Sequence, residues 1–189
     1  MKKPSKEEAL LAVETMLRYI GEDPWREGLK DTPKRIVRSW EKLYGGYNKS
    51  SKELLSTAFK GEGYDQMVFL GPVEFYSTCE HHLLPFSGVA YIGYIPGDIG
   101  RVVGVSKLAR LVEIYARRLQ IQERMTKQIA DALEDCIQPA GVGVVVKAQH
   151  LCMTARGVEK KQALMITSAM RGALLEKDSA RMEFLELMK

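Results

Sequence analysis

Apolar positions near the start of the chain recur every three or four residues, which is the spacing of an amphipathic helix. The first stripe consists of Leu10, Val13, Leu17 and Ile20. Gly21 follows it as a stop signal, and Thr32-Pro33 predicts a second helix with Thr32 as N-cap and Pro33 at the first helical position. Its stripe consists of Ile36, Trp40, Leu43 and Tyr44. We therefore expect an N-terminal helical region over residues 1–64.

From Met67 the pattern changes to segments rich in β-branched and aromatic residues, which is typical of strands. The predicted strands cover residues 67–79, 87–95, 142–152 and 164–174. Between the two pairs lie two helical stripes, one beginning at Ser106 and one over residues 122–137, and the chain end returns to helix. This order predicts an α+β domain over residues 65–189 with a largely antiparallel sheet.

Composition excludes several classes of protein. The 189 residues are 46% apolar and 28% charged, which is typical of a globular rather than a disordered chain. The net charge of +4 is too small to indicate a nucleic-acid partner. No apolar run approaches the ~18 residues that a membrane span requires, and the charged stretch before Leu10 lacks the core of a signal peptide. We expect a cytoplasmic protein with no nucleic acid and no membrane among its partners.

Histidine and cysteine are scarce and lie together. Of three histidines and three cysteines, every histidine lies within three residues of a cysteine. The odd number of cysteines argues against a disulfide-stapled secreted domain. Cys79-Glu80-His81-His82 lies where the first strand meets a turn, and His150 and Cys152 share one face of the third predicted strand. Thiolate and imidazole ligands suit zinc.

We predict that Cys79, His82 and Cys152 are the metal ligands, with water in the fourth position. Only the first cluster has the pair spacing of a structural zinc site, which favours an open, catalytic site over a closed one with four protein ligands. His81 and His150 then remain for proton transfer. Two alternatives stay open: a closed structural site, and buried residues that hold no metal.

Basic residues at one predicted helix start indicate an anion site. Ser106 as N-cap, with Lys107 and Arg110, lies where free amides and the helix dipole attract anions. Alone, these residues fit an ordinary capped helix with solvated charges better. Three further basic residues are Arg156, four positions after Cys152, and Arg35 and Arg38, one helical turn apart. Several cations near a zinc pocket favour a polyphosphate substrate.

Gln122-Glu123 begins the second helix of the central pair. A carboxylate beside an amide can accept from two adjacent N–H groups, which is the pattern that guanine presents at N1 and its 2-amino group. The residues alone favour the simpler interpretation, in which Glu123 stabilises a helix N-terminus.

Several motifs occur in one order along nearly the whole chain beyond about Leu10. They are GEDPWREGL (21–29), TPKR (32–35), STCEHH (77–82), GVSKLAR (104–110), QER (122–124) and HLCMTARG (150–157). Together they resemble the GTP cyclohydrolase I family. The resemblance implies the tunnelling fold, an antiparallel four-stranded sheet with two crossing helices. It also implies a homo-oligomer, a decamer of two pentamer rings with active sites between subunits.

The implied reaction converts GTP and water to 7,8-dihydroneopterin triphosphate and formate, the first step of tetrahydrofolate or pterin biosynthesis. The family's ligands for zinc, Zn2+, correspond to Cys79, His82 and Cys152. Zinc lowers the pKa of water toward ~7 for attack at C8 of guanine. The resemblance further implies that His150 protonates the purine and assists ring opening, that His81 supports proton transfer, and that Glu123 with Gln122 holds the guanine edge. The residues implied to hold ribose or triphosphate are Ser106, Lys107, Arg110, Arg156, Arg35 and Arg38.

Two other functions stay open from the sequence. One is a zinc-stabilised, non-catalytic assembly that binds a nucleotide, against which His81 and His150 beside an open metal position argue. The other is a different pterin- or purine-processing enzyme of the same fold, from which a strong preference for GTP over guanosine would distinguish this chain.

Overall fold

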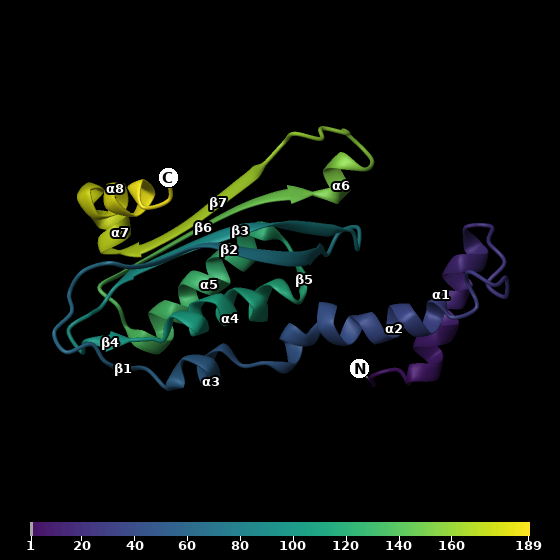
Figure 1. The fold of residues 1–189 in the computed structure, drawn as a ribbon, viewed down its shortest axis with the longest axis horizontal. Helices are drawn as coiled ribbons and strands as arrows, with labels where there is room; N and C mark the ends of the chain where they lie inside the picture. The colour runs from purple at the N-terminus through teal and green to yellow at the C-terminus, as the bar shows by residue number, and fades with distance from the viewer. Residues whose placement is uncertain (1) are drawn as a thin grey trace. The chain divides into compact units, whose positions relative to one another are not determined.

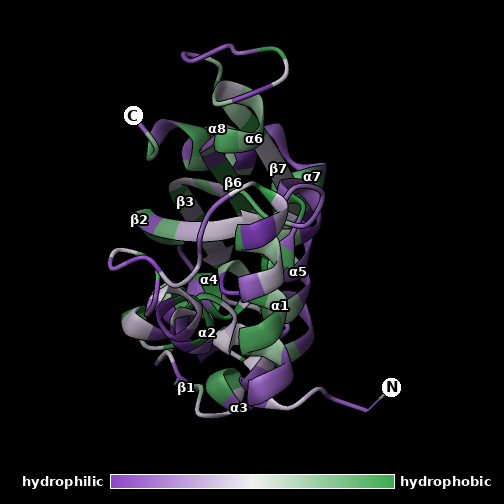
Figure 2. Ribbon diagram, turned by 90° about the vertical axis from the view of Figure 1, so that its right-hand side faces the viewer, coloured by the Kyte–Doolittle hydropathy of each residue, from purple (hydrophilic) through white to green (hydrophobic). Residues whose placement is uncertain are grey.

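The N-terminal apolar stripes form helices α1 (Lys6–Tyr19) and α2 (Thr32–Leu43) in the computed structural model, which describes residues 2–189. The N-cap of α2 is Asp31 rather than Thr32, so the following proline lies in the first turn, where a missing N–H costs nothing. Hydrophobic and hydrophilic residues alternate around α1 (Figure 2). The two helices pack together in a compact unit, Met1–Gly45.

The second compact unit is Gly46–Lys189, so the packing boundary precedes the one expected between residues 64 and 65. The elements in between are η1 (Gly45–Asn48), α3 (Ser51–Ser56) and β1 (Phe59–Lys60). Leu55 of α3 is completely buried among residues of the second unit's core. Composition and polarity could not reveal this boundary because one buried leucine attaches an otherwise polar segment.

An antiparallel sheet dominates the second unit (Figure 1). Its long strands are β2 (Val68–Cys79), β3 (Pro85–Ile95), β6 (Gly141–His150) and β7 (Met165–Gly172), in that spatial order. Within residues 2–189 the sheet has a fifth strand, β5 (Leu119–Gln120), which pairs parallel to the end of β2. A four-stranded sheet was therefore an incomplete prediction, because two residues are too short to show a period. β4 (Arg101–Val102) pairs separately with β1.

Helices α4 (Val105–Ala116) and α5 (Gln122–Ile137) cover one face of this sheet (Figure 1). Their side chains with no exposed surface include Leu108, Leu111, Val112, Met125, Ile129, Leu133 and Ile137. They pack in one cluster with alternate residues of the strands, among them Ile92 and Val144. Burying each such side chain contributes about 1.5–3 kcal/mol, so this layer fixes where α5 begins relative to the sheet.

Helices α7 (Ala173–Glu176) and α8 (Asp178–Glu186) lie on the opposite face (Figure 1). Phe184 of α8 is fully buried there, against Gly93 of β3 and Gly143 of β6. A Cβ at Gly93 would come within 2.6 Å of the Phe184 ring, so the missing side chain lets the ring reach the sheet. Within residues 2–189, no helix has both the length and the apolar character to cross a membrane.

Candidate active site

Two thiols and one imidazole converge at the end of the sheet where β2 stops. The ligand atoms of Cys79, His82 and Cys152 all lie within 4.8 Å of one another. Cys79 is the last residue of β2 and is 5% exposed, His82 lies on the exposed turn that follows, and Cys152 lies on the short helix α6 (Leu151–Thr154). Both cysteines are free thiols. The structure thus gathers the three residues that were predicted as ligands.

The turn between β2 and β3 brings His82 back toward Cys79. The Cys79 amide donates to the Leu84 carbonyl at 2.8 Å, and the Leu83 amide donates to the Cys79 carbonyl at 2.9 Å. Leu83 takes a left-handed conformation, with φ of 55°, which reverses the chain tightly. In an extended strand, residues three apart would point to opposite faces. The turn therefore makes the Cys-x-x-His spacing usable by one ion.

The expectation that Cys152 continues the strand face of His150 was wrong. β6 ends at His150, whose register partner is Phe86, and α6 begins with the next residue. The next position on β3 is Pro85, which has no N–H to continue the ladder. The chain turns into α6 instead, and this turn carries Cys152 toward Cys79.

The charge balance of the cluster favours a bound cation. Burial raises the pKa of the Cys152 thiol, and the neighbouring Cys79 thiol raises it further. Arg156 partly offsets this effect, and its guanidinium contacts Nε2 of His82. Two thiolates this close repel each other unless a positive charge lies between them. A donor set of two sulfurs and one nitrogen is one that catalytic zinc sites use, with one position left open, so these residues fit the ion.

His150 lies next to this cluster, at the end of β6, and is half-buried. Its ring stacks on Phe86, with centroids 4.4 Å apart and planes 3° from parallel. Its Nε2 lies 2.8 Å from Oε1 of Gln122. Burial lowers the pKa of His150, while the charge of Glu123 opposes this shift. His81 is exposed on the turn, with its ring centroid 6.2 Å from that of His82.

The side chain of Gln122 faces the interior rather than a ligand. It is 1% exposed, and its Nε2 donates to the carbonyls of Val146 and Met165 and to Oγ1 of Thr167, each at 3.1 Å. The side-chain amide is thus already bonded within the chain, and the expectation that Gln122 helps to hold a guanine edge stays a prediction. Glu123, the next residue, is exposed and free of this network.

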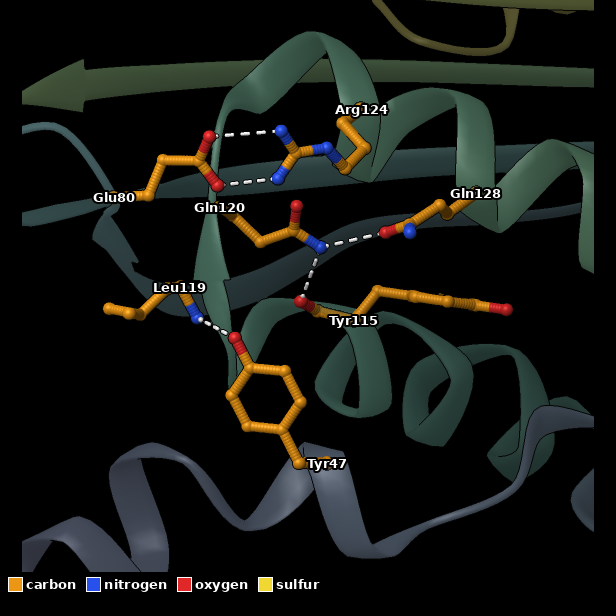
Figure 3. A network of polar contacts seen from close by, with 7 residues as sticks. All are labelled: Tyr47, Glu80, Tyr115, Leu119, Gln120, Arg124 and Gln128. Atoms are coloured by element: carbon orange, nitrogen blue, oxygen red, sulfur yellow. Dashed lines mark hydrogen bonds and ion pairs between the residues drawn. The ribbon is translucent and has the colours of Figure 1, made fainter. Parts of the chain in front are cut away.

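An ion pair fastens the metal-ligand turn to α5 (Figure 3). Arg124 donates through both Nη atoms to the two carboxylate oxygens of Glu80, which lies between Cys79 and His81. The hydrogen bond from Arg124 lowers the pKa of Glu80. The Glu80 amide also donates to the Gln120 carbonyl at 3.0 Å. The turn is thus held through both its backbone and a side chain.

The short strand β5 has its own supports (Figure 3). Nε2 of Gln120 donates to the Tyr115 carbonyl at 3.0 Å and to Oε1 of Gln128 at 2.8 Å. The amide of Leu119 donates to the Tyr47 hydroxyl at 3.1 Å. These bonds connect β5 to α4, α5 and η1, so the segment that pairs with Thr78 and Cys79 is anchored on several sides.

Comparisons with known proteins agree with the motif order. A model of the GTP cyclohydrolase I family matches residues 9–189. The chain belongs to this family. It is 54% identical over 183 residues to GTP cyclohydrolase 1 of Wolinella succinogenes, covering 95% of this chain and 97% of that protein. It is 53% identical over 178 residues to GTP cyclohydrolase 1 of Dehalococcoides mccartyi, covering 94% of each.

A solved structure, the archaeosine synthase QueF-Like in the apo form, is far more distant. It overlaps 58% of this chain at 17% identity and a TM-score of 0.42, which is too low to bear on fold or function.

One group of residues that the family resemblance assigned to the substrate lies far from the metal cluster of the same chain. Ser106, Lys107 and Arg110 lie in the first turns of α4. Just before α4, the amide of Val103 donates to the Tyr94 hydroxyl at 3.1 Å, and Tyr94 pairs with Val68. Val68 and Cys79 are the two ends of β2, a strand that spans about 35 Å. Within a single chain, the basic start of α4 therefore lies far from the two thiols.

The start of α4 also differs in detail from expectation. Gly104 is the N-cap, so Ser106 is the second helical residue and its exposed side chain is not the cap. The Lys107 ammonium donates to the carbonyl of Thr57 at 3.1 Å and also contacts the Thr57 hydroxyl. Arg110 is exposed one turn further along. Within this chain the helix start is a basic surface.

Arg35 and Arg38 lie on α2, in the N-terminal unit. Both line a surface pocket of about 530 Å³ with Asp31 and Lys34, and their binding of a shared ligand stays a prediction. Arg35 also forms an ion pair with Asp31 at 3.7 Å. Arg156, by contrast, lies beside the metal cluster, as its distance from Cys152 along the sequence suggested.

Two contacts that support the candidate site were not predicted from the sequence: the Glu80–Arg124 ion pair and the stacking of Phe86 on His150. Glu80 and Arg124 both occur in the motifs, yet their pairing joins positions 44 apart in the chain. Phe86 carries no chemical signal, and its contact with His150 depends on strand register. The one available signal for this pair was the opposite charge of two residues that lie beside predicted site residues: Glu80 follows Cys79, and Arg124 follows Glu123.

Proposed function

We propose that this chain catalyses the zinc-dependent conversion of GTP and water to 7,8-dihydroneopterin triphosphate and formate, the first step of tetrahydrofolate or pterin biosynthesis. The observation that carries the proposal is the convergence of Cys79, His82 and Cys152 beside His150. It occurs in a chain whose relatives, at 53–54% identity, are named GTP cyclohydrolase 1. The chain is therefore a hydrolase that binds GTP.

Cys79, His82 and Cys152 would hold the zinc ion. When bound, zinc supplies a Lewis acid that makes water acidic enough to serve as a nucleophile near neutral pH. Other residues of the chain shape the surroundings of the ion. Arg156 places a positive charge beside His82, and the Glu80–Arg124 pair fixes the turn that carries His81 and the ligands Cys79 and His82. His82 is exposed at the edge of this cluster.

His150 would exchange protons with the purine during attack and ring opening. Burial lowers the pKa of this half-buried side chain and so favours its neutral form, and a neutral imidazole can take up a proton and return it. His81, on the open turn, would support proton transfer to solvent. Glu123 would accept from N1 and the 2-amino group of guanine with its exposed carboxylate.

The triphosphate would be held by Arg156 together with Ser106, Lys107, Arg110, Arg35 and Arg38. Because the start of α4 lies at the far end of β2 from the thiols, a complete site requires α4 from another subunit. This separation supports active sites between subunits, and the family resemblance implies the assembly, a homodecamer of two pentamer rings. The edge strands β5 and β7 offer the backbone groups through which sheets could join, as in the tunnelling fold. We place the catalytic region in residues 65–189 and the enzyme in the cytoplasm.

The test is to incubate the zinc-loaded protein with GTP and to measure pterin fluorescence and formate together. Stoichiometric formation of both products is expected, with GTP strongly preferred over guanosine because the basic residues bind the triphosphate. A chain that binds GTP but releases no formate would be a nucleotide-binding assembly instead. Release of a different base product would indicate another purine-processing activity.

A further inference from the structure

The buried amide of Gln122 has only one possible orientation. One of its two terminal atoms lies 3.1 Å from the carbonyl oxygens of both Val146 and Met165. Carbonyl oxygens only accept hydrogen bonds, so this atom must be the amide nitrogen, which supplies both of its hydrogens. The other terminal atom is therefore the amide oxygen. The orientation of the amide therefore follows from the hydrogen-bonding capacity of its neighbours and not only from the assignment of its nitrogen and oxygen atoms.

Two threonines complete the network around the same side chain. The Thr126 hydroxyl donates to the backbone carbonyl of Gln122 at 2.8 Å and lies 2.6 Å from the Thr167 hydroxyl. Because Thr126 has spent its hydrogen, Thr167 must donate to Thr126, and its lone pairs then face the Gln122 amide nitrogen at 3.1 Å. The two amide hydrogens of Gln122 thus serve three acceptors, with one hydrogen shared, and all three acceptors require nitrogen at this position. Gln122 is 1% and Thr126 1% exposed, so water does not compete.

The amide oxygen points at His150, with 2.8 Å between Oε1 of Gln122 and Nε2 of His150. An amide oxygen cannot donate, so Nε2 of His150 must carry a hydrogen. A neutral imidazole carries only one, which leaves Nδ1 with a free lone pair. The ring cannot tilt away from this bond without losing its parallel stacking on Phe86, which is itself 1% exposed.

We propose that Gln122 is a positioning residue that holds neutral His150 with its hydrogen on Nε2 and so makes Nδ1 the nitrogen that exchanges a proton with the substrate. The tautomer follows from the network alone, and only its use in catalysis rests on the proposed function. In each cycle Nδ1 would gain one proton and release one, while Nε2–H stays bonded to Gln122. Gln122 thus acts through His150 without touching the substrate.

The first experiment reads the tautomer directly, in zinc-loaded protein without substrate. The chain has three histidines, so labelling with ¹³C,¹⁵N-histidine and magic-angle-spinning NMR gives few signals, and His150→Asn assigns that of His150. Nε2 is identified by its couplings to both ring C–H groups. We expect neutral His150 to show a protonated Nε2 and a bare Nδ1. A bare Nε2 in the wild-type protein overturns the proposal, whether or not any variant folds.

The second experiment uses Gln122→Met, which keeps the side-chain length and removes the amide. We expect His150 to populate both tautomers, kcat for GTP to fall about 10- to 100-fold, and the KM and bound zinc to change little. Gln128→Met is the matched control, because it is the same substitution on the same helix at a glutamine whose bonded partner is Gln120. It should keep the tautomer and kcat.

The outcomes separate this inference from the proposed function. If the wild-type protein shows Nε2–H on His150 but makes no pterin and formate, the proposed function fails and the tautomer stands. If Gln122→Met shifts the tautomer and leaves kcat unchanged, the positioning role is overturned although the enzyme is active. A fall in kcat of the same size in Gln128→Met would also overturn it, because a general effect of disturbing α5 would then explain the loss.

Discussion

The two ends of β2 differ in how many of the predicted site residues one chain brings together there. At the Cys79 end, a tight turn, the last register pair of β6 and the helix α6 bring two thiols, His82, His150 and Arg156 together within one chain. At the Val68 end lies the start of α4, where Ser106 and Arg110 are exposed and Lys107 is half-buried, far from these groups. Local chain reversal is enough to gather the thiols and imidazole of one cluster, whereas residues at opposite ends of a long strand stay apart within one chain.

The largest effect should follow from breaking the cluster end. Cys152→Ala removes one of two thiolates, and we expect loss of bound zinc and of measurable GTP turnover, read by elemental analysis and the formate assay. Cys136→Ala is the control: Cys136 lies on α5 and burial raises the pKa of its thiol, so it should keep both zinc and activity. A fully active Cys152→Ala protein would falsify the ligand prediction.

His150→Ala should separate chemistry from metal binding at the same end. The side chain of His150 lies beside the cluster but is bonded to Gln122, so zinc content should stay at the wild-type level. Losing the proton carrier should lower kcat by about 10²- to 10⁴-fold. Zinc content and single-turnover rates measured on one preparation test this. Loss of zinc in this variant would make His150 a ligand and would show that the count of three is wrong.

Lys107→Ala tests the opposite end of β2. We expect the KM for GTP to rise about tenfold or more, with bound zinc unchanged, because one charge-assisted contact to phosphate is lost. Activity on guanosine, which has no phosphate, should change little by comparison.

Mixed assemblies sharpen this comparison further. If the two ends meet across a subunit boundary, coexpression of Lys107→Ala with Cys152→Ala should yield some sites in which Cys152 comes from one chain and Lys107 from the other, so that both residues are present. Activity should then exceed the sum of the two separate variants. Activity no greater than that sum would place both groups in the same chain's site.

The smallest effect should come from the Glu80–Arg124 pair, which is partly exposed. Arg124→Gln should weaken zinc binding by about tenfold at most, because the ligands remain and only the hold on their turn is loosened. Since Arg124 lowers the pKa of Glu80, the ion pair forms at neutral pH and is lost as pH falls below the ordinary range of a glutamate. Chelator competition near pH 7 and in mild acid measures this, and the difference between wild type and variant should shrink in acid.

Much of the fold was predictable because periodicity is local. Each long strand and the two central helices lie within about two residues of their expected ends. The errors have specific causes. Ser106 was mistaken for a cap because sequence alone does not show that the backbone turns at Gly104. The two-residue strand β5 has no period at all, and its pairing with Thr78 depends on where α4 ends.

The sequence by itself determined the chemistry that this chain can offer: its scarce histidines and cysteines, their spacing, and the motifs that mark the family are properties of residue type and order. Only the tertiary structure decided what each of these residues faces. In the tertiary structure Cys152 lies on α6, and the Gln122 side chain bonds to His150. Lys107 lies at the end of β2 far from Cys79. The physical reason is that side-chain partners are set by strand register and helix packing, which join positions tens of residues apart and leave no local pattern.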